Sequence, residues 1–173
     1  LIGSHIDSVP NGGNFDGALG SLAAIEVARV VAAAGLATRH PVEVVVWAHE
    51  EGGTFPNGLN GSRAVAGQLI AGEMDHVWNG LRRADGVRRI GGDPDRIVDA
   101  RRTPWFHAYL ELHIEQGGTL DRQRVSIGVV EGIVAISRFR ALIVGAANHA
   151  GTTPMADRQD ALVAASELVL AIR

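Results

Sequence analysis

Residues 41–52, Pro41-Val42-Glu43-Val44-Val45-Val46-Trp47-Ala48-His49-Glu50-Glu51-Gly52, join the most apolar run of the chain to two adjacent acidic side chains. The β-branched run 42–48 is typical of a buried strand in a parallel sheet. Before it, apolar residues recur at helical spacing over 17–34, and Gly35 stops this pattern. Residues 1–5 read as the end of another strand. Strand, helix and strand in this order predict an α/β sheet with a crossover helix.

The remaining segments predict shorter elements. We expect short helices over 62–70, 75–83 and 94–101, strands over 109–114, 125–130 and 135–144, and an amphipathic helix over 157–173. The pattern changes from α/β to strand pairs near Gly132. The sequence therefore predicts an α/β domain over 1–132, with a mixed, mostly parallel sheet and flanking helices. Residues 133–173 are expected to begin a smaller α+β domain.

Composition excludes several classes of protein. The 173 residues carry a formal net charge of −3, which gives no basic surface for nucleic acid. The chain has no cysteine, so disulfides and thiolate metal ligands are excluded, and a reducing cytoplasm is the expected location. No apolar run approaches the roughly 20 residues of a membrane-spanning helix, and no signal-peptide pattern is visible. We expect neither a nucleic-acid nor a membrane partner.

Both ends of the chain fall inside predicted structure. The first residue is Leu1 rather than Met, and the helical pattern continues to Arg173 without a stop signal. We therefore expect the chain to be a fragment of a longer protein.

Acidic and histidine side chains gather at the predicted strand ends, where ligands bind in open α/β sheets. His5 could bind a metal through one ring nitrogen while Asp7 holds the other N–H. Asp16 follows in a glycine-rich loop, although an isolated Asp at this place is more often a helix N-cap. Neither feature is specific by itself.

Glu50 and Glu51 form a further cluster. Two adjacent carboxylates at a buried strand end cost free energy unless a cation or a proton compensates them. Taken alone, the pair would equally fit a solvated junction between strand and loop. With a metal present, one carboxylate can ligate while the other takes a proton from the attacking water.

A fourth element is the predicted strand that carries Glu111, His113 and Glu115. Strand alternation places these three side chains on one face. A lone histidine there would more often be structural. Four such elements at strand ends favour a metal site over four unrelated structural residues.

These motifs together resemble the amidase/hydantoinase/carbamoylase family of the co-catalytic metallopeptidase clan. The resemblance rests on residues 3–13, 16–17, 50–52, 61–63, 111–117 and 148–155, and it covers essentially the whole chain. It implies hydrolysis of a linear C–N bond in a carbamoyl or ureido compound, such as an N-carbamoyl-L-amino acid or allantoate. The resemblance also implies that 1–132 is the N-terminal part of a metallohydrolase catalytic domain and that 133–173 begin a lid or dimerisation domain. It further implies a homodimer formed through this lid domain.

The resemblance further implies a site for two divalent ions, for which Zn²⁺, Mn²⁺ and Co²⁺ all suit oxygen and nitrogen ligands. His5, Asp16 and His113 match the ligands of the first ion, and Asp7 matches the partner that orients His5. Asp16 matches the carboxylate that bridges both ions, and Glu51 matches a ligand of the second.

Three further residues match the family's catalytic and substrate-binding positions. Glu50 matches the general base, and Gln116 falls where the family contacts substrate. His149 matches a lid-domain histidine that contacts substrate and stabilises the reacting carbonyl oxygen across the dimer interface.

The sequence departs from the family pattern in three places. Thr54 stands where the family commonly has a basic residue, and the family's last histidine ligand and its carboxylate-binding arginine are expected beyond Arg173.

Two alternatives to the carbamoyl or ureido amidohydrolase stay open. One alternative is a dipeptidase or deacylase of the same clan, although such relatives usually have a carboxylate at the position of His113. The other is an inactive truncated chain or a non-catalytic scaffold.

Overall fold

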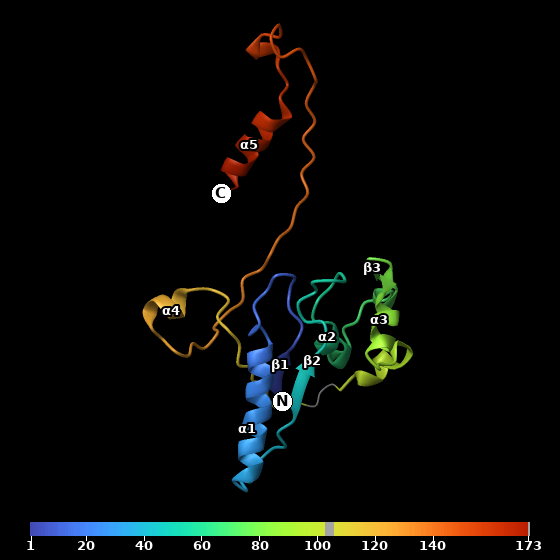
Figure 1. Ribbon diagram of the computed structural model, residues 1–173, viewed down its shortest axis with the longest axis vertical. Coiled ribbons are helices and arrows are strands. Elements are labelled where there is room, and N and C mark those ends of the chain that lie inside the picture. The colour runs from blue at the N-terminus through green and yellow to red at the C-terminus, as the bar shows by residue number, and fades with distance from the viewer. Residues whose placement is uncertain (103–105, 173) are drawn as a thin grey trace. The chain divides into compact units, whose positions relative to one another are not determined.

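The computed structural model describes residues 1–102 and 106–172 (Figure 1). The chain divides into two units, Leu1–Gly128 and Val129–Arg173.

Unit 1 is organised around one parallel strand pair. Strand β1 (Ile2–His5) pairs with β2 (Val44–Trp47) in a register that sets His5 beside Trp47, and helix α1 (Ala18–Ala33) connects them. Helix α1 lies against β1, where Ser21 Oγ donates to the carbonyl oxygen of His5 at 2.8 Å. The predicted succession of strand, crossover helix and parallel strand is confirmed.

A third segment lies along the other edge of β1. Leu110 forms a parallel bridge with Ile2, and its amide donates to the carbonyl of Leu1 at 3.0 Å. The predicted strand over 109–114 is reduced to this single bridge. Because the chain runs parallel here as well, residues 111–116 leave the sheet at the same edge as the segments that follow β1 and β2.

The sheet differs from the expected one in size and burial. Among the described residues, the strands form the parallel pair β1–β2 and a separate antiparallel pair, so the fold is mixed α/β with small sheets. Strand β2 was expected to be buried, but Val44 and Val46 are exposed while Val45 and Trp47 are half-buried. The described elements thus cover only one face of β2.

In the segment after β2, the predicted helix over 75–83 is wrong. Helix α2 (Asn60–Ala66) and the 3₁₀ helices η1 (Glu73–Asp75) and η2 (Pro94–Ala100) lie close to predicted helices, but no helix spans 75–83. Strands β3 (Val77–Trp78) and β4 (Leu81–Arg82) form a hairpin there, followed by α3 (Arg83–Arg89). Asn79 and Gly80 both have positive φ, at 47° and 77°, which is the conformation of a two-residue hairpin turn.

A buried ionic cluster ties this segment together. The carboxylate of Glu73 is 2% exposed and accepts hydrogen bonds from Asn60, Arg63 and Arg83. The guanidinium of Arg83 also lies 5.2 Å from the ring centroid of Phe55 and donates to the carbonyl of Pro56. Arg83 therefore joins α3 to the loop that follows Glu50 and Glu51.

The strands expected over 125–130 and 135–144 are absent from the described structure. Helix α4 (Thr119–Gln123) ends before them, and most of their apolar side chains are exposed. Residues 129–144 run as an extended chain in Figure 1. A segment of alternating apolar residues forms a strand only where a neighbouring strand pairs with its backbone amides and carbonyls. No described segment pairs with residues 125–144 in this way.

The rest of unit 2 is a closed loop and a helix. Ala146 bridges Gln159 in antiparallel fashion, the 3₁₀ helix η3 (Met155–Asp157) lies within the loop, and α5 (Ala161–Ala171) follows. The expected helix over 157–173 is shorter because Asp160 caps it, accepting from the amide of Leu162 at 2.8 Å. None of the described helices is long and apolar enough to cross a membrane.

Candidate metal centre

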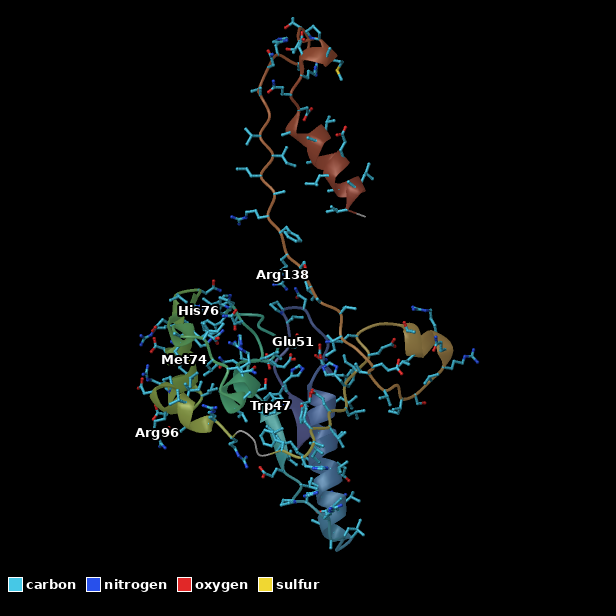
Figure 2. All side chains as sticks on the ribbon, turned by 180° about the vertical axis from the view of Figure 1, so that it is seen from behind. Trp47, Glu51, Met74, His76, Arg96 and Arg138 are labelled. Carbon is cyan, nitrogen blue, oxygen red and sulfur yellow. The ribbon has the colours of Figure 1, made fainter. Side chains whose placement is uncertain are left out.

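The fold brings four chain segments to one edge of the parallel sheet. His5 is the last residue of β1, Glu50 and Glu51 follow β2, Asp16 precedes α1, and His113 follows the bridge at Leu110. Glu51 lies beyond the end of β2, where the loops of unit 1 converge (Figure 2). The carboxyl ends of parallel strands meet at one edge, and this geometry gathers the clusters that the sequence separates.

Gly17 lets α1 begin directly against His5. Its φ is 62°, and a Cβ at this position would lie 2.6 Å from Cγ of the His5 ring. His5 is consequently only 1% exposed. Gly17 rather than Asp16 is the N-cap of α1, so the Asp16 carboxylate is not used for capping.

The two histidines of the cluster are held in the same tautomer. His5 Nδ1 lies 2.8 Å from the carbonyl oxygen of Asp7, and His113 Nδ1 lies 2.8 Å from that of Ile114. Because a carbonyl can only accept, Nδ1 carries the proton of each neutral ring and Nε2 presents a lone pair. The two Nε2 atoms lie 3.4 Å apart. Two facing lone pairs repel each other unless a proton or a cation lies between them.

Asp16 adds an oxygen to this pair. Its Oδ1 lies 3.2 Å from His113 Nε2 and 3.8 Å from His5 Nε2, and it is buried without a hydrogen-bond partner. Its Oδ2 accepts from Gln116 Nε2 at 2.8 Å. Burial raises the pKa of Asp16, but hydrogen bonds from Gln116 and Glu51 outweigh it, so the net shift is downward and favours the carboxylate.

Glu51 and Glu50 complete the cluster from the β2 side. Burial raises the pKa of Glu51, and the hydrogen bond and charge of Asp16 raise it further. Glu51 Oε1 is also buried without a partner. Glu50 Oε2 lies 3.7 Å from His5 Nε2, and burial raises the pKa of Glu50 against the opposing charge effect of His5. Each carboxylate would be stabilised as an anion by a cation placed among them.

Asp7 holds its neighbours in a different way from the one expected. The sequence suggested that its carboxylate fixes the His5 ring, but the nearest carboxylate oxygen is 3.7 Å from His5 Nδ1. The backbone carbonyl of Asp7 holds the ring instead. The carboxylate accepts from the amides of Glu50 at 3.0 Å and Glu51 at 3.1 Å, because the β1 and β2 loops leave the sheet side by side.

The two remaining predicted site residues lie in different units. Gln116 belongs to unit 1 and bonds Asp16, and the substrate contact expected of it stays a prediction. His149 belongs to unit 2, where its Nδ1 accepts from the amides of Gly151 and Thr152 at 3.0 and 3.1 Å.

A network beside the histidines was not assigned from the sequence. The Glu111 carboxylate accepts from Ser4 Oγ at 2.5 Å and from the Tyr109 hydroxyl at 2.7 Å, and the Trp47 indole donates to that hydroxyl at 2.9 Å. Burial and the bond to Glu111 raise the pKa of Tyr109. Strand alternation already placed Glu111 on the face of His113, but it did not show that Ser4 and Tyr109 hold both carboxylate oxygens.

Residues 1–173 match the model of peptidase family M20/M25/M40. The chain belongs to this family. The M20 family is metal-dependent, and the described residues include two groups that could hold an ion, His5 with Glu111 and His113, and His5 with Glu50 and Glu51. The buried unpartnered oxygens and the facing Nε2 lone pairs fit a cation.

Curated relatives and solved structures narrow the resemblance within the M20 family. N-carbamoyl-L-amino acid amidohydrolase of Geobacillus stearothermophilus is 44% identical over 99% of this chain and 42% of its own length. Allantoate deiminase of Arabidopsis thaliana is 34% identical over 98% of this chain and 34% of its own length. The crystal structure of a hydantoinase/carbamoylase family amidase from Burkholderia ambifaria matches 98% of this chain and 42% of its own, with 35% identity and a TM-score of 0.75. The chain thus spans less than half of each, and the resemblance inferred from its motifs is confirmed.

Proposed function

We propose that this chain carries part of the active site of a metal-dependent amidohydrolase. The enzyme hydrolyses a linear C–N bond in a carbamoyl or ureido compound, of which N-carbamoyl-L-amino acids and allantoate are the leading candidates. The observation that carries the metal site is the pair of Nε2 lone pairs of His5 and His113, which face each other beside the unpartnered Oδ1 of Asp16. The names of the relatives support the substrate class.

His5, Asp16 and His113 would hold one divalent ion, and Asp16 and Glu51 would contribute to a second. The absence of sulfur ligands suits Zn²⁺, Mn²⁺ or Co²⁺. When bound, such ions polarise the scissile carbonyl and lower the pKa of the attacking water toward ~7.

Glu50 is proposed as the general base that takes a proton from the attacking water and returns it to the leaving nitrogen. Its carboxylate lies beside the proposed metal ligands, with Oε2 3.7 Å from His5 Nε2. Its position depends on Asp7, whose carboxylate holds the Glu50 amide. Base and metal ligand are therefore neighbours on one restrained segment.

His149 and Gln116 are proposed to contact the substrate, with His149 donating a hydrogen bond to the reacting carbonyl oxygen. We assign 1–132 to the catalytic domain and 133–173 to the beginning of a lid and dimerisation domain. In a homodimer built through the lid, His149 would serve the active site of the partner subunit. A cytoplasmic location is part of the same proposal.

A dipeptidase or deacylase of the same clan is the competing assignment. The presence of a histidine at 113, rather than a carboxylate, and the carbamoyl- and allantoate-acting names of the relatives favour the amidohydrolase.

The test uses the complete protein that carries this chain, loaded in turn with Zn²⁺, Mn²⁺ and Co²⁺. N-carbamoyl-L-amino acids, allantoate, ureidopropionate, N-acetyl amino acids and dipeptides would be compared, with released ammonia and amine both quantified. We expect kcat/KM for at least one carbamoyl or ureido compound to exceed that for every N-acetyl amino acid and dipeptide by about a hundredfold. Equal or greater activity on dipeptides would overturn the assignment.

A further inference from the structure

The loop that carries His149 is closed at its base. The amide of Ala146 donates to the carbonyl of Gln159 at 2.9 Å, which forms the antiparallel bridge between these residues. A Cβ at Gly145 would lie 2.8 Å from the amide nitrogen of Ala161, so the two ends of the loop are in close contact. The intervening residues are thus held as a loop independently of unit 1.

Backbone amides fix the tautomer of His149 in this loop. Gly151 and Thr152 both direct their N–H groups at His149 Nδ1, at 3.0 and 3.1 Å. A backbone amide can only donate, so Nδ1 presents its lone pair and the neutral ring carries its proton on Nε2. The arrangement is the reverse of that at His5 and His113, where carbonyls hold the proton on Nδ1. The backbone thus makes two histidines Nε2 acceptors and the third an Nε2 donor.

Arg158 braces the peptide group that supplies the first of these amides. Its Nη2 donates to the carbonyl of Ala150 at 2.5 Å, and its Nε donates to the carbonyl of Thr153 at 3.2 Å. The carbonyl of Ala150 and the amide of Gly151 belong to one planar trans peptide and point in opposite directions. Holding the carbonyl on the guanidinium therefore aims the N–H at His149, and the positive charge polarises this peptide toward stronger donation.

We propose that Arg158 is a positioning residue that, through the Ala150–Gly151 peptide, keeps His149 in the Nε2–H form needed to donate to the reacting carbonyl of the substrate. The donor role of His149 rests on the function proposed above, whereas the holding of the ring by Arg158 does not. A donor in place before the reaction stabilises the negative charge that develops on the oxygen. The other tautomer would present a lone pair to the same oxygen and repel it.

The complete protein, labelled with ¹⁵N-histidine, provides a direct readout of the ring. Long-range ¹H–¹⁵N correlations would be recorded in mildly alkaline buffer, well above the pKa of ~6.5 of a free imidazole, with His149→Asn to assign the signals. We expect a pyridine-type Nδ1 and a pyrrole-type Nε2 for His149 in the unaltered protein. A proton on Nδ1 would overturn the proposal whatever the variants do.

Arg158→Gln, Arg158→Lys and Arg138→Gln form the variant series. Arg158→Gln should move the His149 signals toward an average of the two tautomers and lower kcat by about tenfold to a hundredfold, with KM changed less than about threefold. Arg158→Lys keeps one charged donor and should give intermediate values. Arg138→Gln removes a guanidinium elsewhere in unit 2 and should match the unaltered protein in both readouts.

Unchanged His149 signals and unchanged kcat in Arg158→Gln would overturn the positioning role. If Arg158→Gln fails to fold, Arg158→Lys and the ring signals of the unaltered protein still decide the matter. If the protein hydrolyses no carbamoyl or ureido compound while Arg158→Gln still shifts the ring signals, the proposed function fails and the holding of His149 by Arg158 stands.

Discussion

The Nε2 atoms of His5 and His113 lie 3.4 Å apart, and a backbone carbonyl holds the proton of each ring on the opposite nitrogen. Neither ring can donate to the other in this arrangement. Two facing lone pairs are the arrangement expected of the metal site proposed above.

His113→Ala and Asp16→Ala should each lower the affinity for the more tightly bound metal ion by about a hundredfold or more. Each change removes a proposed ligand, and even the loss of a supporting contact typically costs ~10–100-fold. Calorimetric titration of the metal-free protein with Zn²⁺ measures the effect. His107→Ala is the control, because His107 is exposed and stacks on His40 away from the cluster. Unchanged affinity in both variants would remove these residues from the site.

Glu50→Gln and Glu51→Gln should impair different properties of the enzyme, the first turnover and the second metal binding. Glu50→Gln removes the proposed base and should lower kcat by about 10²–10⁴-fold while both ions stay bound. Glu51→Gln replaces a half-buried carboxyl group beside Asp16, which is a proposed metal ligand, and should lower metal occupancy at one site. Elemental analysis and steady-state kinetics on the same samples separate the two effects. A loss of less than about tenfold in Glu50→Gln would argue against its role as the base.

Asp7→Asn tests whether the Asp7 side chain holds Glu50 and Glu51 while its backbone carbonyl holds His5. The carboxylate accepts from two backbone amides, and an asparagine side chain would set its own NH₂ against one of them. We expect kcat to fall by about tenfold to a hundredfold as Glu50 and Glu51 lose their restraint. The carbonyl of Asp7 still holds His5, so affinity for the first ion should change little. A large loss of affinity for the first ion, with normal kcat at saturating metal, would show that the Asp7 carboxylate orients the His5 ring after all.

Glu73→Gln should destabilise unit 1 by about 3–5 kcal/mol, because it leaves the buried guanidinium of Arg83 without its anion. Urea unfolding of the complete protein, followed by tryptophan fluorescence, measures the change. Glu26→Gln removes a carboxylate from an exposed ion pair with Arg29 and should have little effect. Equal effects of the two changes would show that the buried cluster does not stabilise the fold.

The lowered pKa of Glu73 also leads us to expect that the free energy of unfolding falls in acid. Burial raises its pKa, but hydrogen bonds from Arg63 and the Ile70 amide outweigh this, and the net shift is below the ordinary carboxyl value of 4.5. The unfolded chain therefore binds a proton more readily than the folded one, and the stabilisation is complete above pH 4.5. It is lost as the pH falls below this value toward the folded pKa. Midpoints of urea unfolding measured across this range should fall more steeply for the unaltered protein than for Glu73→Gln.

Local patterns in the sequence determined the β1–α1–β2 succession and the strand-end positions of the acidic and histidine residues. Periods of two and about 3.6 residues follow from the backbone of each segment alone, and parallel strands always end at a common edge. Asn79 and Gly80 both favour positive φ, so the hairpin turn that stands in place of the predicted helix over 75–83 is also encoded locally. Residues 125–144 have a strand-like pattern without a described partner, and local pattern cannot supply one.

Only the tertiary structure decided the proton positions on the three histidines and the task of the Asp7 carboxylate. A histidine ring is a donor or an acceptor at Nε2 according to the backbone group that lies about 3 Å from Nδ1. That group is a carbonyl for His5 and His113 and a pair of amides for His149. Residue type fixes which atoms can hydrogen-bond, but loop geometry fixes the direction of each bond. The sequence therefore determined where the histidines stand, and the fold determined which of them present a lone pair at Nε2 and which presents an N–H group there.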